Sequence, residues 1–553
     1  MMWSSVISYI PSFPVFFQAF MTLLIPQLFF LVAKVYRKRV NMIENNRKYQ
    51  ANEVNSNSTE DQEGPKILGQ LGNDLEILTE KIGHNSDVHF RNFHIKLLNR
   101  KATLIYVEGM QQSDFINMHV LKPLMVEAPS QYVPSQINIV TYVKEHLLPV
   151  IHVNEMDSIQ TLSKMILYGY TVLLIDGMNT ALLVGVPNMA SRSVEEPISE
   201  ALIRGPRIGF TEVLTENTAM LRNHGLNENL VINTNLIGSK SQKTIAIAYM
   251  NDIANDELVR EVKERVAKLD FDYFADSGYV EQLMEDNIFS PFQQFQNTER
   301  PDKVIAALLE GRIAILLDGS PFVLIAPASF MMLFQSPEDY YQRWVSGTMT
   351  RILRIAAALL SLFAPALYIS FISFNPGLIP TQLALTIIEA RQGVPFPSIL
   401  EVLILEISIE ILRESGIRLP KPIGPAMGIV GGLVVGEAAV QAGIVTPFLV
   451  IVVALTAISS FTIPEYSLGI SLRYLRFGAM MFASILGLYG TIIFFLLLCT
   501  HMIHLRSFGL PYLSPISPMQ AADNKDVLLR SPLTFLRDKP KSLKTKKRNA
   551  DKE

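Results

Sequence analysis

Three carboxylates inside an apolar stretch are the side chains of this sequence with the clearest potential for chemistry. Glu401, Glu406 and Glu410 are the charged residues of the segment Val394–Leu412. Each ionised acid costs about 2.5 kcal/mol or more at the centre of a lipid-facing helix. Because Glu406 and Glu410 share one face at 100° per residue, the segment is predicted to be amphipathic. Two placements stay open: the segment lies along the membrane interface, or its acidic face lines water.

A fourth acid follows a regular series of glycines. Glu437 stands one helical turn before Gln441. The glycines, spaced four residues apart, are Gly424, Gly428, Gly432 and Gly436. This spacing places them on nearly one face of a helix, where another backbone packs closely. An acid beside that face is a functional hypothesis, because burying it in hydrocarbon without a partner is costly. The alternative for Glu437 is a structural ion pair with Arg473 or Arg476.

These acids suggest a route for ions. A ring of carboxylates that lines a pore concentrates cations there. The candidate ion pathway therefore consists of Glu401, Glu406, Glu410, Glu437 and Gln441.

Motifs of enzymes and cofactor sites do not occur in the sequence. It has no Walker A loop, Rossmann glycine fingerprint, HExxH helix or nucleophile elbow. His501 and His504 stand at a membrane boundary without further ligands, and the single cysteine, Cys499, lies in an apolar run. We therefore predict no enzyme activity, no cofactor and no metal site. The net charge of −3 gives no basic footprint for nucleic acid.

Charged and apolar residues are distributed unevenly along the 553 residues. Residues 41–340 have the composition of a soluble protein, whereas charges thin out between Ile352 and Met502. Apolar segments that approach the ~20 residues needed to cross a bilayer are Leu353–Phe374, Val394–Leu412, Pro425–Ala442, Pro447–Ile463 and Gly478–Thr500. The predicted fold is an α/β soluble domain of two subdomains, followed by an α-helical multi-pass membrane domain.

The basic C-terminal tail constrains the number of crossings. Residues 504–553 hold 11 Lys and Arg against 5 Asp and Glu, which predicts a cytoplasmic tail. If the soluble domain lies on the same side, the number of crossings is even, so one of the five segments does not cross. Its three acids make Val394–Leu412 the predicted exception. The end of the tail, Lys539–Arg548, either rests on anionic lipid or is solvated.

The N-terminal residues differ from the rest of the chain. An apolar stretch followed by basic residues predicts a membrane anchor within residues 1–40, unless translation starts at Met42. The other predicted regions are a disordered linker at 41–66, a cytoplasmic soluble domain at 67–345, a membrane domain at 350–503 and the tail at 504–553.

Two stretches of the soluble part share one pattern. Tyr168–Pro187 and Glu310–Pro327 each place Asp-Gly between two apolar runs, which predicts a hairpin because glycine accepts the positive φ of the turn. The two hairpins are either equivalent halves of one sheet, with a second subdomain at about 206–297 between them, or unrelated. Apolar residues at helical spacing predict a helix over 256–269.

Several motifs, in order along the chain, resemble one known family. Arg204, Gly205, Pro206 and Arg207, followed by Gly209, Phe210 and Glu212, are similar to the RGPREGFxE signature of spore germinant-receptor A subunits of the GerA type. Further matches are Asp276–Gln282 (DSGYVEQ), Thr298–Asp302 (TERPD), Gln335–Tyr341 (QSPEDYY), Val394–Pro397 (VPFP), Leu412–Pro420 (LRESGIRLP) and Ser507–Tyr512 (SFGLPY). Together the matches cover about Asp87 to Pro518.

The resemblance implies an A subunit that works with B and C subunits in the inner membrane of a bacterial endospore. Such proteins are similar to oligomeric ion channels that open when the receptor senses nutrients, with cation release as an early step of germination. The family's germinant site is usually attributed to the B subunit, so this chain would be the conductor rather than the primary sensor.

Three other functions stay open. The runner-up is a paralogue of the A subunit that associates with the dipicolinate-release channel. A secondary transporter would move its substrate through broken helices, but it predicts inverted repeats, and none is visible across Leu353–Thr500. A scaffold would assemble the other subunits and conduct nothing.

The sequence departs from the family pattern at two places. Ile208 stands where the signature has an acid. Residues Gly436–Gly443 read GEAAVQAG where the family usually reads GQAAVEAG, so Glu437 and Gln441 are exchanged. The exchange keeps one acid within a helical turn but displaces it by four positions along the chain. The predicted N-terminal anchor also lies outside the family pattern.

Overall fold

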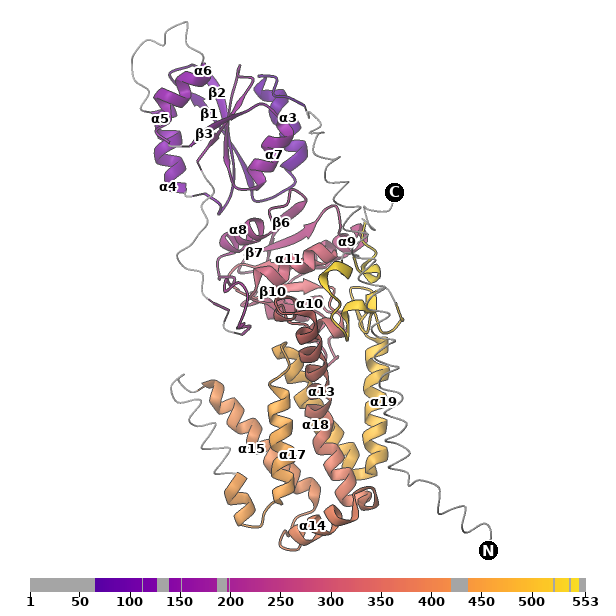
Figure 1. Cartoon of the computed structure of the whole chain (residues 1–553). Coiled ribbons are helices and arrows are strands. Elements are labelled where there is room, and N and C mark those ends of the chain that lie inside the picture. The colour runs from indigo at the N-terminus through magenta and orange to yellow at the C-terminus, as the bar shows by residue number, and fades with distance from the viewer. Residues whose placement is uncertain are drawn as a thin grey trace, which may run out of the picture. The chain divides into compact units, whose positions relative to one another are not determined.

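The structure is a computed structural model, shown in Figure 1. It describes residues 65–111, 113–126, 139–150, 152–185, 196–197, 199–418, 436–520, 523–536 and 539–546. The predicted N-terminal anchor and nearly all of the predicted linker lie outside these residues. The described residues belong to one compact unit that begins at Pro65.

The first subdomain is a five-stranded antiparallel sheet between two layers of helices. Its strands are β1 (Val88–Ile95), β2 (Arg100–Val107), β3 (Val153–Met156), β4 (Thr171–Ile175) and β5 (Ala181–Val184), in the order β1-β2-β4-β5-β3. Helices α3 (Leu71–Ile82) and α7 (Ile159–Leu167) cover one face, and α4 (Ser113–Ile116), α5 (Lys122–Met125) and α6 (Ile139–Tyr142) cover the other (Figure 1). Successive strand residues point to opposite faces, so Leu104 joins one core and Ile105 the other.

The second subdomain repeats this architecture. Its strands are β6 (Leu230–Ile237), β7 (Lys243–Met250), β8 (Gln296–Thr298), β9 (Ile313–Leu317) and β10 (Val323–Ala326), in the order β6-β7-β9-β10-β8. Helices α8 (Leu214–His224) and α11 (Pro301–Glu310) pack on one face, and α9 (Asp256–Ala267) and α10 (Ser277–Met284) on the other. Helix α9 confirms the helix predicted over 256–269.

Both predicted hairpins are present, one in each sheet. Gly177 and Gly319 have φ of 81° and 84°, so the Asp-Gly turns need glycine for the predicted reason. Asp176 accepts a hydrogen bond from the N–H of Leu71, the first residue of α3, at 3.3 Å. The corresponding carboxylate of the second subdomain, Asp318, accepts from the first residue of α8 at 3.2 Å. The hairpins are therefore equivalent parts of two similar subdomains.

This arrangement corrects one prediction. The hairpins are not halves of one sheet, and the second subdomain does not end near residue 297. Strands β9 and β10 complete its sheet, which runs on to Ala326. The prediction placed the boundary too early because it assigned the second hairpin to the first sheet.

A helical region follows the two subdomains. It begins after the short helix α12 (Glu338–Tyr341) and comprises α13 (Trp344–Ile369), α14 (Thr381–Arg391), α15 (Ser398–Arg418), α17 (Pro447–Ser460), α18 (Tyr466–Leu486) and α19 (Leu488–His504). Among the described helices, the continuous stretch from Trp344 to Phe374 is, by length and composition, long and apolar enough to cross a membrane. Helices α17 and α19 are apolar but shorter.

Helices α15 and α17 run parallel to each other and antiparallel to α13. The contacts that fix these directions are the hydrogen bonds Ser373–Ser398, Tyr368–Thr446 and Arg413–Ser460. Two of them place the starts of α15 and α17 beside the end of α13, and the third joins the ends of α15 and α17. The predicted segment Pro425–Ala442, which lies between α15 and α17 in the sequence, falls largely outside the described residues.

Helices α18 and α19 form an antiparallel hairpin that turns at Gly487. This residue has φ 59° and ψ −136°, and it lies against the ring of Phe374. The predicted single segment Gly478–Thr500 is therefore wrong, since it combines the end of one helix with most of another. Arg473 and Arg476 depress the hydropathy of the first half of α18, which hid this helix from the sequence analysis.

The C-terminal tail packs back onto the second subdomain. Strands β11 (Arg506–Ser507) and β12 (Leu510–Pro511) form a small hairpin, and Tyr512 after them is fully buried. Leu543 is also buried, and the N–H of Lys546 donates to the carbonyl of Ile253 at 3.0 Å. The described part of the tail is thus folded onto this subdomain. Its basic composition had instead predicted a tail that is solvated or rests on anionic lipid.

Candidate functional site

The three acids of α15 are each paired with an arginine. The pairs are Arg391 with Glu401 at 2.9 Å, Arg476 with Glu406, and Arg473 with Glu410 at 3.0 Å. Glu401 and Glu406 are fully buried. The acidic face of α15 is turned onto the arginines of α18 and α14. This differs from both predicted placements, in which the acids faced water at the membrane interface or in a water-filled path.

Glu437 has a different environment. It is exposed on the helical residues 436–441, and the side-chain amide of Gln441 donates to its carboxylate at 3.1 Å. The alternative of an ion pair with Arg473 or Arg476 is contradicted, since both arginines have other partners. Of the predicted candidate ion pathway, Glu437 is therefore the acid without an arginine partner in the described structure.

The predicted glycine face is described at one of its four positions. A Cβ on Gly436 would lie 3.6 Å from the side chain of Val450, which is ordinary van der Waals contact with α17. Gly424, Gly428 and Gly432 lie outside the described residues, so the packing face stays a prediction.

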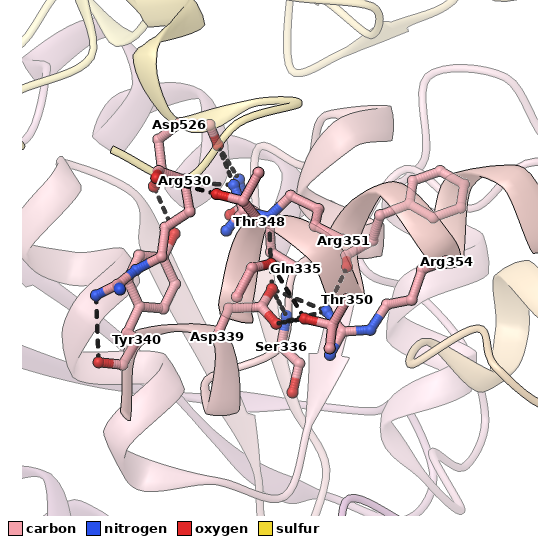
Figure 2. Close-up of polar contacts among 12 residues, drawn as sticks. Gln335, Ser336, Asp339, Tyr340, Thr348, Thr350, Arg351, Arg354, Asp526 and Arg530 are labelled. Carbon is pink, nitrogen blue, oxygen red and sulfur yellow. Dashed lines mark hydrogen bonds and ion pairs between the residues drawn. The ribbon is translucent and has the colours of Figure 1, made fainter. Parts of the chain in front are cut away.

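A buried network joins the tail to the start of α13, and we call it the tail cluster (Figure 2). Its members are Asp339, Tyr340, Arg351, Arg354, Asp526 and Arg530. Arg351 of α13 is fully buried and binds Asp339 at 3.4 Å and the carboxylate of Asp526 at 2.9 Å. Arg354, one turn later, also binds Asp339, at 2.7 Å. Two arginines of the first long helix are thus held by acids from α12 and from the tail.

Arg530 adds a second link between the tail and α12. Its guanidinium donates to the carbonyls of Gln342 and Tyr340 at 3.2 and 3.3 Å. Its own carbonyl accepts from Thr348 of α13 at 3.2 Å. The hydroxyl of Tyr340 donates to Asp526, so its proton is held in the cluster, and burial raises the pKa of this hydroxyl.

A second network, which we call the signature cluster, joins the second subdomain to the start of α18. Its members are Glu200, Arg300, Asp302, Lys303, Tyr341 and Glu465. Lys303 of α11 binds Glu200 at 2.6 Å and Glu465, the residue before α18, at 3.6 Å. Arg300 binds Asp302 at 3.0 Å and donates to the carbonyl of Pro206 at 2.7 Å.

The predicted signature residues lie at the edge of this cluster. Arg204, Gly205, Pro206 and Arg207 are exposed in an irregular segment. A Cβ on Gly205 would lie 2.6 Å from the ring of Tyr341, so only glycine fits against this ring. Arg207 lies 3.8 Å from Glu196 in an exposed pair. The segment contributes backbone atoms and close packing rather than a binding pocket of its own.

Comparison with known proteins identifies the family. The profile described as "Bacillus/Clostridium GerA spore germination protein" matches residues 76–542, most of the chain. This chain belongs to the GerA family of spore germination proteins. The resemblance inferred from the motifs is thereby confirmed.

Individual relatives of this GerA-family chain match over nearly their whole length. Spore germination protein GerLA of Bacillus cereus is 40% identical over 484 residues, which cover 87% of this chain and 98% of the relative. Spore germination protein B1 of Bacillus subtilis (strain 168) is 40% identical, with coverages of 86% and 97%. The uncharacterized membrane protein YfkQ of Bacillus subtilis (strain 168) is also 40% identical, with coverages of 87% and 93%.

One solved structure is similar to part of the GerA-family chain. It is the crystal structure of the N-terminal domain of the A subunit of the Bacillus megaterium spore germinant receptor GerK3. The sequences are 32% identical, the match covers 48% of this chain and 98% of that domain, and the TM-score is 0.38.

In this GerA-family chain, three of the motifs that carried the resemblance meet at the two clusters: the segment Arg204–Arg207, Thr298–Asp302 and Gln335–Tyr341. Thr298–Asp302 supplies Arg300 and Asp302, and Gln335–Tyr341 supplies members of both clusters. These motifs carried the resemblance but no predicted role. Four further members of the clusters were not predicted from the sequence: Lys303, Arg351, Glu465 and Asp526. The signal that could have found them is that the motifs lie beside the ends of helices. Among the described residues, no group of three His, Cys, Asp or Glu could hold a metal ion.

Two acids near the signature cluster have raised pKa values. Burial, reinforced by Glu285, Glu465 and Asp276, raises the pKa of Glu281 to about 8. Burial also raises the pKa of Glu465 to about 7, against the attraction of Lys303. The folded protein therefore holds protons that the unfolded chain releases above pH ~4.5, so stability from these groups is complete below that pH and is lost as pH rises through 7 to 8.

We expect the thermal stability of the detergent-purified GerA-family chain to fall between pH 5 and pH 8. Glu281→Gln removes one titrating group and is expected to make this decline shallower, because glutamine mimics the protonated acid. Melting curves at each pH measure the effect, with the exposed acid change Glu264→Gln as control. An equal slope in Glu281→Gln and in the unaltered chain would show that Glu281 is ionised throughout.

Proposed function

We propose that this chain is the A subunit of a spore nutrient-germinant receptor and conducts cations as an oligomer in the spore inner membrane. In this role it assembles with B and C subunits, and the opening of its pore triggers germination. Its family membership, its helical region and the exposed acid Glu437 support the proposal. Its α/β domain and its tail lie on the cytoplasmic side, in the spore core.

Six crossings account for the contacts of the helical region. With the shorter α14 left aside, α13, α15, α17, α18 and α19 alternate in direction, except that α15 and α17 are parallel. The segment Pro425–Ala442, predicted from the sequence and largely outside the described residues, is our candidate for the sixth crossing. Since the tail and the α/β domain contact each other, an even number is required. In this arrangement α15 crosses, because its acids are neutralised by arginines inside the protein rather than exposed to lipid.

A role in gating is supported by two buried ion pairs, one at the start of α13 and one at the start of α18. The α/β domain holds α13 through Arg351 and Asp339, and it holds the start of α18 through Glu465 and Lys303. Buried charge pairs are costly to separate, so the domain and the two helices move together. A rearrangement of the α/β domain, caused by the partner subunits, is thereby passed to the membrane helices.

Glu437 is our candidate for the pore-lining acid. A carboxylate already paired with arginine adds little net negative charge, which applies to Glu401, Glu406 and Glu410. Glu437 is exposed and bonded to a neutral amide, so no arginine of the described structure offsets its negative charge for passing cations. In an oligomer one Glu437 from each subunit forms the ring.

Glu437→Gln is expected to reduce cation conductance and cation selectivity of the receptor reconstituted in planar bilayers. The change preserves size and the hydrogen bond to Gln441 but removes the charge. Glu414→Gln is the matched control, because Glu414 is an exposed acid of the helical region that pairs with Arg418 at 2.7 Å. Unaltered conductance and selectivity in Glu437→Gln would remove Glu437 from the pore.

Identification of the partners tests the receptor assignment. Co-purification of the tagged chain from spores is expected to recover receptor B and C subunits. Recovery of the dipicolinate-release channel in their place would assign the chain to the alternative complex, and purified oligomers without current in any activated state would assign it to a scaffold.

A further inference from the structure

A loop with an exposed apolar tip lies against the last turn of α19. Residues 285–291, between α10 and β8, form this loop, and its tip carries Ile288 and Phe289, which are 70% and 97% exposed. Ser290 beside them forms a hydrogen bond with His501 of α19 at 2.9 Å. The ring of Phe292 stacks on the same histidine, with 6.1 Å between ring centroids. These contacts hold the tip at the level where the apolar helix ends.

The loop is held rigidly by a buried amide. The side chain of Gln294 is fully buried and accepts the N–H groups of Asp286 and Asn287 at 2.8 and 3.1 Å. It also donates to the carbonyl of Asn287 at 2.8 Å. The side chain of Asn287 in turn accepts the N–H of Phe289 at 3.1 Å. The two apolar side chains are therefore presented outward by a fixed backbone.

We propose that Ile288 and Phe289 insert into the boundary between lipid headgroups and acyl chains, so that the α/β domain contacts the bilayer directly. Exposure of both side chains to water is unfavourable by roughly 25 cal/mol per Å² of apolar surface, and insertion removes this cost. The inference rests on the proposed function, because it requires α19 to cross the membrane.

Lipid fits this surface because the apolar surface of α19 reaches the loop. Leu497, one turn before His501, is half exposed on α19. Just beyond the helix end, Arg506 is an exposed cation, which suits the level of anionic headgroups. Trp344 is half exposed at the start of α13, and tryptophan is enriched at membrane interfaces. The tip is thus continuous with a surface that has the composition of a lipid boundary.

Site-directed fluorescence tests the insertion in the full chain. The background is Cys499→Ala, and single cysteines are introduced as Phe289→Cys, Leu497→Cys and Leu226→Cys. Leu226 is a half-exposed apolar residue in the loop after α8 and serves as the water-exposed control. Each protein is labelled with bimane and reconstituted in vesicles of phosphatidylcholine and phosphatidylglycerol. Quenching of the bimane fluorescence by iodide, present in the water on both sides of the vesicle membrane, is compared with quenching by lipids spin-labelled near the headgroup.

The label at position 289 is expected to show blue-shifted emission, strong quenching by the spin-labelled lipid and protection from iodide. The label at position 226 is expected to respond to iodide alone. If position 289 responds to iodide alone while position 497 responds to lipid, the insertion is wrong and the crossing of α19 stands. If position 497 also fails to respond to lipid, the proposed membrane placement fails. Protection of position 289 from both quenchers would assign the tip to a protein interface and overturn the proposal.

Discussion

Glu406→Leu is expected to lower the stability of the folded chain by about 3–5 kcal/mol, because it leaves the guanidinium of Arg476 buried without its partner. Both side chains are almost completely inaccessible to solvent, so water cannot replace the lost carboxylate. Arg476→Leu is expected to have an effect of the same sign and size, since it leaves the acid of α15 unpaired. Melting curves of the detergent-purified chain measure both changes.

The double variant Glu406→Leu with Arg476→Leu separates a paired interaction from a general packing defect. Two leucines remove both charges and fill the space with apolar atoms, so the double variant is expected to recover most of the stability lost by either single change. The exposed pair Glu414–Arg418 is the control, where changes of about 0–1 kcal/mol are expected. Additive losses in the double variant would show that the two side chains are not coupled.

Arg351→Met is expected to release the C-terminal tail and to destabilise the chain by about 3–5 kcal/mol. The change leaves the carboxylate and the carbonyl of Asp526 without the donors that lie 2.9 and 2.6 Å away. Limited proteolysis of the full chain, followed through a C-terminal tag, measures release of the tail. In the proposed receptor, we also expect the variant to lose its response to nutrients, because Arg351 no longer links α13 to Asp339 of α12 and to Asp526 of the tail.

Two further variants make this result specific. Arg351→Lys keeps the charge but lacks the fork that reaches Asp339 and Asp526 together, so an intermediate rate of cleavage is expected. Arg418→Met removes an arginine that is mostly exposed and should leave cleavage unchanged. A tail as resistant in Arg351→Met as in the unaltered chain would show that other contacts hold it.

The sequence predicted those features that depend on neighbouring residues. Asp-Gly between apolar runs located both hairpins, and apolar residues at helical spacing located α9. The segments at Leu353–Phe374 and Pro447–Ile463 correspond to α13 and α17 for the same reason. Each of these patterns acts within one turn or one helix, where the chemistry of a single stretch decides the conformation.

Features that depend on distant partners could not be predicted in this way. Glu410 and Glu406 of α15 lie 63 and 70 residues before their partners Arg473 and Arg476, and a linear pattern does not show which arginine a glutamate meets. The same arginines lowered the apparent hydropathy of α18, so the charges that neutralise the acids also concealed the helix. In the tail, Tyr512 and Leu543 are isolated apolar residues without period, and both are buried. The burial of Tyr512 depends on residues far away in the sequence, among them Phe292 and Phe330, whose rings contact it.

The tail cluster has a consequence for biosynthesis. A chain made from its N-terminus forms its domains in order, and the two subdomains leave the ribosome before the helices that follow α12. Asp526 is made 175 residues after Arg351, yet Asp526 and Arg530 are bonded to α12 and α13. Helix α13 therefore acquires these contacts only after the other described helices of the helical region have been made. A chain that lacks the tail leaves Arg351 with fewer partners, so synthesis of the tail is a condition for a locked junction.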